Sequence, residues 1–264
     1  MLVHPNFDPV AISIFGLQVQ WYGLMYVAGF LSVYFLWVYR IKTYPEFAES
    51  KWNPEVVSDL IFYGALGAVI GGRLGYVLFY KPGYFLNNFI EIAYIHQGGM
   101  SFHGGLLGVI AGIYLFSRKI KLGFMQVADF VAPAAPIGLF FGRLGNFINQ
   151  ELWGKTTDVP WGMVFTNGGP LPRHPSMLYE AILEGLVLLL VIWWVARKPR
   201  AVGVLSGLFL IGYAIARIIV EFVRVPDEHL NYLLFDWVTM GQILSLPMLL
   251  LGLYLVKTAK LKNS

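Results

Sequence analysis

The chain has 264 residues, of which 57% are hydrophobic and only 13% are charged. Because a soluble globular domain is about 45–50% apolar and about 25% charged, this composition excludes a soluble fold. The formal net charge is +4, but the basic residues flank apolar runs, which indicates orientation in a membrane rather than binding of nucleic acid. There are no cysteines, which excludes a disulfide framework, a cysteine-ligated metal and a cysteine nucleophile.

The N-terminal sequence MLVHPNFDP comes first and lacks a basic region, so we expect no cleavable signal peptide. Seven segments that follow are apolar over the roughly 20 residues that a helix needs to cross the hydrocarbon of a bilayer. They are residues 17–39, 57–80, 98–117, 129–148, 177–196, 203–223 and 237–256. We therefore predict an all-α integral membrane protein of about seven transmembrane helices, formed by residues 1–264 as a single polytopic domain.

Basic residues between these segments predict the orientation. Twelve of them follow the first, third, fifth and seventh segments: Arg40, Lys42, Lys51, Arg118, Lys119, Lys121, Arg197, Lys198, Arg200, Lys257, Lys260 and Lys262. Four follow the other segments: Lys81, Lys155, Arg173 and Arg224. Because basic loops stay on the cytoplasmic side, we predict the N-terminus outside and the C-terminus in the cytoplasm.

Residues 147–175 form the longest stretch between two predicted spans. The stretch contains four glycines and four prolines, which makes it too polar and too interrupted to cross a membrane. We therefore expect it to be a loop insertion that forms a small extracytoplasmic cap.

Ionisable and polar side chains in the predicted spans share one depth, near the outer surface. They are Tyr22, Tyr26, Arg73, His103, Arg143, Asn146, Glu151, Glu180, Arg217 and Glu221. A charge inside a bilayer costs about a few kcal/mol and is usually paired or functional. Three arginines in a partly dry cleft would bind an anion, because guanidinium groups match phosphate oxygens in a bidentate manner. Histidine and tyrosine beside them could transfer a proton.

Purely structural explanations exist for most of these residues. Arg217 and Glu221 are four apart on one helical face and could neutralise each other. Arg73 could extend to the outer headgroups, and Tyr22 and Tyr26 fit an interfacial aromatic belt. His103 lies among glycines and could be a helix-packing residue. None of these explanations accounts for the shared depth.

Several sequence strings carry a family resemblance. They are WYGLMY at 21–26, GGMSFHGG at 98–105, GRLGNFIN at 142–149, ELWG at 151–154, LPRHPS at 171–176, and Gly212-Tyr213 followed by Arg217 and Glu221-Phe222. In this order and at these spacings the chain closely resembles bacterial prolipoprotein diacylglyceryl transferases over nearly its whole length. The resemblance implies that phosphatidylglycerol donates its diacylglyceryl group to the lipobox cysteine thiol of a prolipoprotein precursor. A thioether forms and glycerol phosphate leaves, as the first step of lipoprotein maturation in the bacterial cytoplasmic (inner) membrane.

The resemblance also implies roles for the matching residues. Substrate-binding roles fall to Arg143, Arg217, Asn146, Glu151, Gly154 and Glu221. The two arginines would hold the phosphodiester, Asn146 would orient the headgroup, and the two glutamates would hold the arginines in place. His103 is the first choice for the base that deprotonates the thiol, with Tyr26 as a rival or a hydrogen-bonding partner. No metal and no cofactor are implied.

Two other classes of protein compete with this interpretation. An anion transporter would place polar residues in both leaflets, whereas the cytoplasmic halves of the predicted spans are mostly apolar, with Asp59 and Asp129 only at their ends. An intramembrane serine hydrolase could use Ser101 or Ser206 with His103. However, Ser101 and His103 are two apart and would not face each other on a helix, and no G-x-S-x-G string occurs.

Overall fold

A computed structural model describes residues 2–48, 50–95, 98–226, 233, 235 and 237–259. The chain is mainly helical and divides into two compact units. The first unit comprises Met1–Leu36 and Asp129–Ser264, and the second comprises Trp37–Ala128. The prediction of an all-α membrane protein is confirmed.

Long apolar helices make up most of both units. Five are long and apolar enough to cross a membrane: α1 (Trp21–Thr43), α2 (Pro54–Phe79), the continuous helix Ser176–Val195, α9 (Val204–Glu221) and α10 (Met240–Thr258). A sixth candidate consists of α5 (Phe124–Val131) and α6 (Ala135–Ile148), which are bent by 52° at the break between them. Pro133 lies in that break, and a proline interrupts the hydrogen bonding of a helix.

The third predicted span, 98–117, coincides closely with a helix of the structure. Helix α4 (Phe102–Lys119) does form, but it is not among the helices apolar enough to be a span by composition. It contains His103, Arg118, Lys119 and four glycines, which together lower its mean hydropathy. By length and composition the described residues therefore hold five or six spans, compared with the seven that we predicted.

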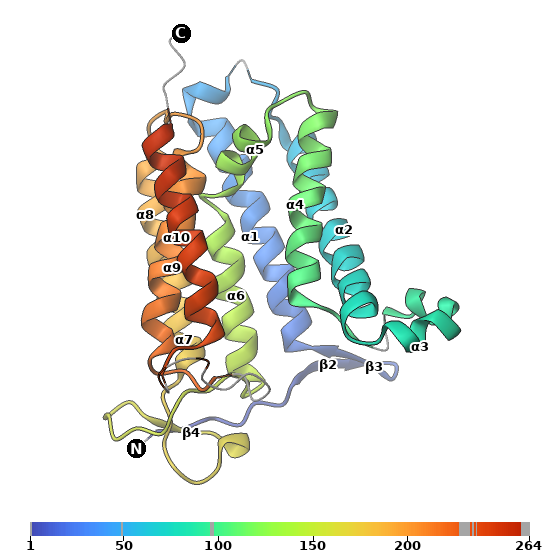
Figure 1. The fold of residues 1–264 in the computed structure, drawn as a ribbon, viewed down its shortest axis with the longest axis vertical. Helices are drawn as coiled ribbons and strands as arrows, with labels where there is room; N and C mark the ends of the chain where they lie inside the picture. Colours follow the sequence, from blue (N-terminus) through green and yellow to red (C-terminus); the bar gives the residue numbers. More distant parts are fainter. Residues whose placement is uncertain are drawn as a thin grey trace. The chain divides into compact units, whose positions relative to one another are not determined.

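In the second unit, α2 and α4 lie side by side (Figure 1) and pack through glycines. A Cβ atom built on Gly67 would lie 2.2 Å from the carbonyl oxygen of Gly108, and one on Gly71 would lie 2.3 Å from that of Gly104. Small residues let helix backbones approach closely in a membrane, where packing rather than the hydrophobic effect drives association. The glycines in this contact therefore stabilise the helix pair.

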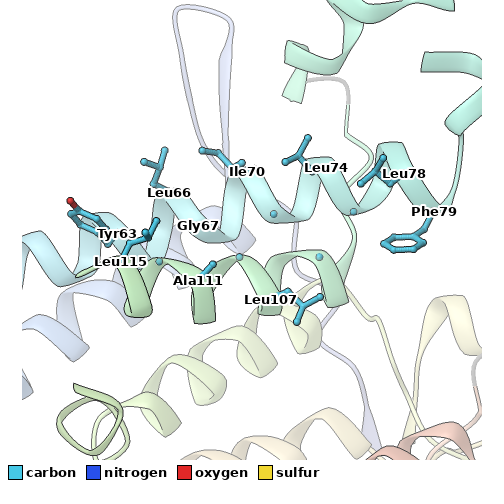
Figure 2. A pocket seen from close by; sticks show the side chains of 15 residues that line it. Tyr63, Leu66, Gly67, Ile70, Leu74, Leu78, Phe79, Leu107, Ala111 and Leu115 are labelled. Carbon is cyan, nitrogen blue, oxygen red and sulfur yellow. The ribbon is translucent and has the colours of Figure 1, made fainter. Parts of the chain in front are cut away.

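An apolar groove of about 460 Å³ runs along this helix pair (Figure 2). Its walls carry leucines and isoleucine, including Leu66, Ile70, Leu74 and Leu107. Among the residues that line it, Tyr63 alone carries a titratable group. The groove therefore has the surface of a lipid-facing helix pair and offers no catalytic chemistry.

Short elements complete the second unit. They are two 3₁₀ turns at Pro45–Phe47 and Phe89–Ala93 and the short helix α3 (Pro82–Asn87). Helix α2 begins at a well-formed cap, because the side chain of Asn53 accepts a hydrogen bond from the amide of Val56.

In the first unit, the helix Ser176–Val195 combines α7 (Ser176–Glu180), a π-helix (Ala181–Val187) and α8 (Leu188–Val195). It packs against α6 and α9, and α9 packs along α10 (Figure 1). The α9–α10 contact again uses glycines, since a Cβ atom on Gly207 would lie 2.8 Å from the carbonyl oxygen of Gly252. This bundle of helices carries most of the buried charge of the chain.

Short strands join the N-terminal segment to the predicted cap, residues 147–175. Strand β1 (Leu2–Val3) pairs in parallel with β4 (Met163–Val164), and a 3₁₀ turn follows at Thr166–Gly168. The cap has a small core of Met163, Phe165 and Met177. A hairpin of β2 (Val10–Ile14) and β3 (Leu17–Gln20) leads directly into α1.

Candidate active site

Three buried glutamates and three arginines meet in the first unit and form what we call the ion-pair cluster. Its members are Arg143 on α6, Glu180 on α7, Glu184 on the π-helix, Arg217 and Glu221 on α9, and Arg224 just beyond α9. The glutamate side chains are at most 2% exposed, and the arginines are 19%, 12% and 9% exposed in sequence order. Buried charges are tolerated only when they are paired, and here the formal charges of the six groups cancel.

Glu180 lies at the centre of the cluster and contacts all three arginines. Its Oε2 atom is 2.9 Å from Nε of Arg143, and its Oε1 atom is 2.5 Å from Nη1 of Arg217. The same Oε1 lies 3.8 Å from Nε of Arg224. One fully buried carboxylate therefore sets the positions of guanidinium groups from different parts of the chain.

Glu184 adds a second carboxylate to the same arginines. Its Oε2 atom lies 3.5 Å from Nη2 of Arg143, and its Oε1 atom lies 3.9 Å from Nη1 of Arg217. Glu184 is part of the π-helix, a conformation that is rare and frequently found at functional sites. Gly185 lets α6 come close to this helix, because a Cβ atom there would lie 2.7 Å from that of Phe140.

Glu221 links the two arginines at the end of α9. Its Oε1 atom is 2.5 Å from Nη2 of Arg217 and 3.2 Å from Nη1 of Arg224. Its Oε2 atom accepts a 2.6 Å hydrogen bond from the hydroxyl of Thr239. The pairing of Arg217 with Glu221, which their spacing of four indicates, is therefore present, and it is one part of a larger network.

Arg143 combines a fixed position with partial access. Its Nε and Nη2 atoms are directed at Glu180 and Glu184, whereas Nη1 meets the neutral side-chain oxygen of Asn146 at 3.5 Å. A contact of that length is weak. At 19% exposed, its side chain is the most accessible of the three arginines. The guanidinium is therefore held on two sides and retains donor capacity on the third.

Asn146 connects Arg143 to Glu151. Its amide nitrogen donates to Oε2 of Glu151 at 3.2 Å, and Asn149 donates to the other carboxylate oxygen at 3.0 Å. Both carboxylate oxygens of Glu151 thus accept from asparagine side chains. Glu151 therefore acts on Arg143 through Asn146, rather than by the direct hold on the arginines that we expected.

The backbone around Glu151 is strained. Gln150 and Leu152 have φ values of 57° and 59°, in the left-handed region that residues other than glycine rarely adopt, at a cost of about 1–3 kcal/mol each. Side-chain contacts hold both in place: Gln150 donates to Asn6 at 2.8 Å, and Ser176 donates to the carbonyl of Leu152 at 2.6 Å. Such strain commonly accompanies functional sites.

Tyr22 and Tyr26 lie in the same unit as the cluster. Their hydroxyl groups are 3.2 Å apart, and either can be the donor. The ring of Tyr22 packs against α6, because a Cβ atom on Gly145 would lie 2.8 Å from its Cδ2 atom. Tyr26 itself is 50% exposed.

Gly154 joins the cap to the end of α9. Its amide donates to the carbonyl of His174 at 2.8 Å, and a Cβ atom there would lie 2.5 Å from the carbonyl oxygen of Val223. It also pairs with Arg224 in an isolated β-bridge. A side chain at position 154 would therefore displace the backbone that carries a member of the ion-pair cluster.

Cap residues beside this contact are themselves ordered by polar contacts. Nδ1 of His174 is 3.1 Å from the hydroxyl of Tyr179, which also accepts a 2.7 Å hydrogen bond from Trp161. Burial, with a smaller effect from the nearby positive charge of Lys155, lowers the pKa of His174. The neutral imidazole therefore prevails at pH 7.

Arg73, in the second unit, does not have the role that the sequence indicated. Its guanidinium donates to the carbonyls of Glu91, Ile92 and Gly98 at 2.5, 2.8 and 2.6 Å and lies over the ring of Phe85. Backbone carbonyls therefore occupy its donors. The expectation that Arg73 supplies a third arginine to an anion-binding cleft is wrong.

His103 is the second residue of α4 and is exposed. Ser101 caps that helix by accepting a hydrogen bond from the amide of Gly104, and the amide of Ser101 donates to the carbonyl of Gly72. The start of α4 is therefore tied to α2. His103 belongs to the second unit, so its location beside Arg143 stays a prediction.

Sequence reasoning overlooked three members of this network: Glu184, Arg224 and Thr239. Glu184 lies four residues after Glu180, and Arg224 lies three residues after Glu221, so helical spacing alone could have indicated the first two. In the part of the chain that the structure describes, no group of histidine, aspartate and glutamate is arranged to hold a metal ion.

Comparison with known proteins adds an independent finding. The model of the prolipoprotein diacylglyceryl transferase family matches residues 9–258. A phosphatidylglycerol–prolipoprotein diacylglyceryl transferase of Idiomarina loihiensis is 56% identical over 257 residues, which cover 97% of this chain and 94% of that protein. Proteins of the same name from Nitratidesulfovibrio vulgaris (strain DP4) and Legionella pneumophila (strain Lens) are each 54% identical over 97% of this chain and 96% and 98% of their own. The matched region contains every member of the ion-pair cluster.

Proposed function

This chain belongs to the prolipoprotein diacylglyceryl transferase family, and from that premise we propose that its ion-pair cluster is the active site. The enzyme transfers the diacylglyceryl group of phosphatidylglycerol to prolipoprotein. The acceptor is the thiol of the lipobox cysteine. Lack of any cysteine in the chain agrees with this, because the nucleophile arrives on the substrate.

The environment of the Arg143 guanidinium is the observation that carries the proposal. A phosphodiester can approach its Nη1 edge, while buried Glu180 and Glu184 hold the other two nitrogens. A donor that is fixed before the reaction needs no reorganisation when charge develops on the leaving group. Arg217 supports the same phosphate from α9, and Asn146 orients the headgroup.

The reaction is a displacement at the carbon of the diacylglyceryl group that bears the phosphate. A base removes the proton of the thiol, the sulfur forms a bond to this carbon, and the carbon–oxygen bond to phosphate breaks. The electron pair leaves with the phosphate oxygen, so that the products are a thioether and glycerol phosphate. Arg143 and Arg217 stabilise the negative charge that grows on the departing phosphate.

We assign the base to His103. A free thiol has a pKa of about 8.5, so it needs a base to react rapidly at neutral pH. His103 is exposed at the start of α4, and histidine is the side chain that most often serves as a general base. Tyr26, which is 50% exposed on α1, is the rival candidate for the base.

The excess of basic residues on alternate loops supports an orientation in the bacterial inner membrane with the N-terminus outside. Of the twelve basic residues on the predicted cytoplasmic side, Lys260 and Lys262 lie outside the described residues. This orientation puts the cluster near the outer leaflet, where a translocated precursor arrives.

One assay tests both the reaction and the base. Purified protein is incubated with phosphatidylglycerol and a lipobox peptide, and the mass added to the peptide is measured as a function of pH. His103→Gln should lose transfer at neutral pH and regain part of it at alkaline pH, where the thiol ionises by itself, while Tyr26→Phe retains the pH profile of the parent. A pH-independent loss in His103→Gln, with alkaline rescue of Tyr26→Phe instead, would assign the base to Tyr26. No added mass with the parent enzyme would reject the function.

A further inference from the structure

Helix α10 begins at the ion-pair cluster, at a residue that has no part in the proposed chemistry. Thr239 is its N-cap residue and is 2% exposed. The Thr239 hydroxyl donates a 2.6 Å hydrogen bond to Oε2 of Glu221, eighteen residues earlier in the chain. Glu221 in turn contacts Arg217 and Arg224. The N-cap residue of α10 is therefore one side chain away from an arginine of the proposed active site.

The Thr239 hydroxyl has two roles at once. It accepts a hydrogen bond from the amide of Gln242 at 3.3 Å, and the side chain of Gln242 accepts one from the amide of Thr239 at 3.0 Å, which completes a capping box. A hydroxyl has one proton and two acceptor lone pairs. Because the helix cap uses an acceptor site, the proton remains available for Glu221.

The start of α10 also fits closely against Glu221. A Cβ atom on Gly241 would lie 2.5 Å from Oε1 of Glu221, so a larger residue there would displace the carboxylate. The amino end of a helix carries a partial positive charge that favours a nearby anion. Further along, the contact of Gly207 with Gly252 fixes α10 against α9. Glu221 is therefore held from a second helix as well as by its own arginines.

We infer that Thr239 is a positioning residue of the transferase, which fixes Glu221 so that Arg217 is presented to the phosphodiester of the lipid. Glu221 has one oxygen on Thr239 and the other on the two arginines. If the first contact is lost, the carboxylate can rotate, and the guanidinium of Arg217 rotates with it. This inference rests on the proposed role of Arg217 in binding the lipid phosphate.

The matched variants Thr239→Asn and Thr239→Asp test the inference. Asparagine and aspartate are about equally good N-cap residues, so both preserve the start of α10. Asparagine can still donate its amide to Glu221, whereas aspartate adds a second carboxylate that repels it. We expect Thr239→Asp to raise the KM for phosphatidylglycerol at least about tenfold relative to Thr239→Asn, with similar melting temperatures. Thr258→Asp, near the other end of α10, is the control for a charge added to this helix.

Equal KM values in the two variants would show that Thr239 only caps the helix, and would overturn the inference. If the aspartate variant does not fold, Thr239→Gly and Thr239→Ser provide the same comparison, because glycine and serine are both accepted at an N-cap but only serine keeps a hydroxyl that can donate to Glu221. A raised KM in the glycine variant alone supports the inference, and equal values contradict it.

Arg217→Gln separates this inference from the proposed function. Unchanged transfer in Arg217→Gln would reject the proposed lipid site itself. Impaired transfer in Arg217→Gln, together with no effect of Thr239→Asp, would reject only the role of Thr239. If Arg217 binds the lipid phosphate and Thr239 positions it, Thr239→Asp should have little further effect on KM in the Arg217→Gln background. The effects of two substitutions that act through one contact are not additive.

Discussion

The sequence Gly-Arg-Leu-Gly occurs twice, at 72–75 and at 142–145, and its two arginines have different environments. Arg73 is 5% exposed and donates to backbone carbonyls of the loop that follows α2. Arg143 is 19% exposed and is held by the carboxylates of Glu180 and Glu184. Carbonyls occupy the donors of the first guanidinium, whereas the second retains an accessible edge. The partners of a buried arginine, more than its local sequence, therefore decide whether its donors are all used to order a loop or partly remain accessible.

The largest expected effect is the loss of transfer activity when the planar guanidinium of Arg143 is replaced. Arg143→Lys retains a positive charge but cannot contact Glu180, Glu184 and a phosphodiester at the same time. We expect kcat/KM for transfer to fall by about 10²–10³, the usual loss when a fixed donor to a developing oxyanion is removed. Arg143→Ala should show a loss at least as large. Full activity in the lysine variant would mean that positive charge alone suffices.

Substitution of Arg73 should lower the thermal stability of the protein. Arg73→Met leaves the carbonyls of Glu91, Ile92 and Gly98 without their donor, and removing one partner of a buried charged contact is costly. We expect thermal unfolding in detergent to shift downward by on the order of 5–10 °C, more than in Arg143→Lys. A melting curve that matches the parent's would show that these contacts contribute nothing to the stability of the second unit.

Substitutions of Glu180 and Glu184, the two buried glutamates around Arg143, should have smaller and unequal effects on lipid binding. Glu180 contacts all three arginines, whereas Glu184 contacts Arg143 and Arg217 at 3.5 Å or more. Glu180→Gln should therefore raise the KM for phosphatidylglycerol about tenfold, and Glu184→Gln by no more than about threefold. The reverse order would place the main support of the arginines on the π-helix.

Much of this arrangement could be predicted from the sequence, because spacing within one helix is local. Composition established the membrane class, and the separation of Arg217 from Glu221 indicated their pair. Contacts between separate helices could not be predicted in this way, and so Thr239 was missed. Arg73 was misassigned because its partners are backbone carbonyls, which no residue type in the sequence reveals. Helix α4 forms where the third span was predicted, but His103, Arg118 and Lys119, together with its four glycines, lower its mean hydropathy, so that length and composition alone do not count it as a span.

Cross-linking with a photoreactive phosphatidylglycerol, labelled in its headgroup, tests the central claim most directly. The lipid could react at the ion-pair cluster or along the apolar groove between α2 and α4 (Figure 2). We predict label on peptides that contain residues 140–151 and 213–224, and loss of this label in Arg143→Ala. Label confined to residues 63–79 and 104–115, or label at the cluster that persists unchanged in Arg143→Ala, would contradict the assignment of the ion-pair cluster as the lipid-binding active site.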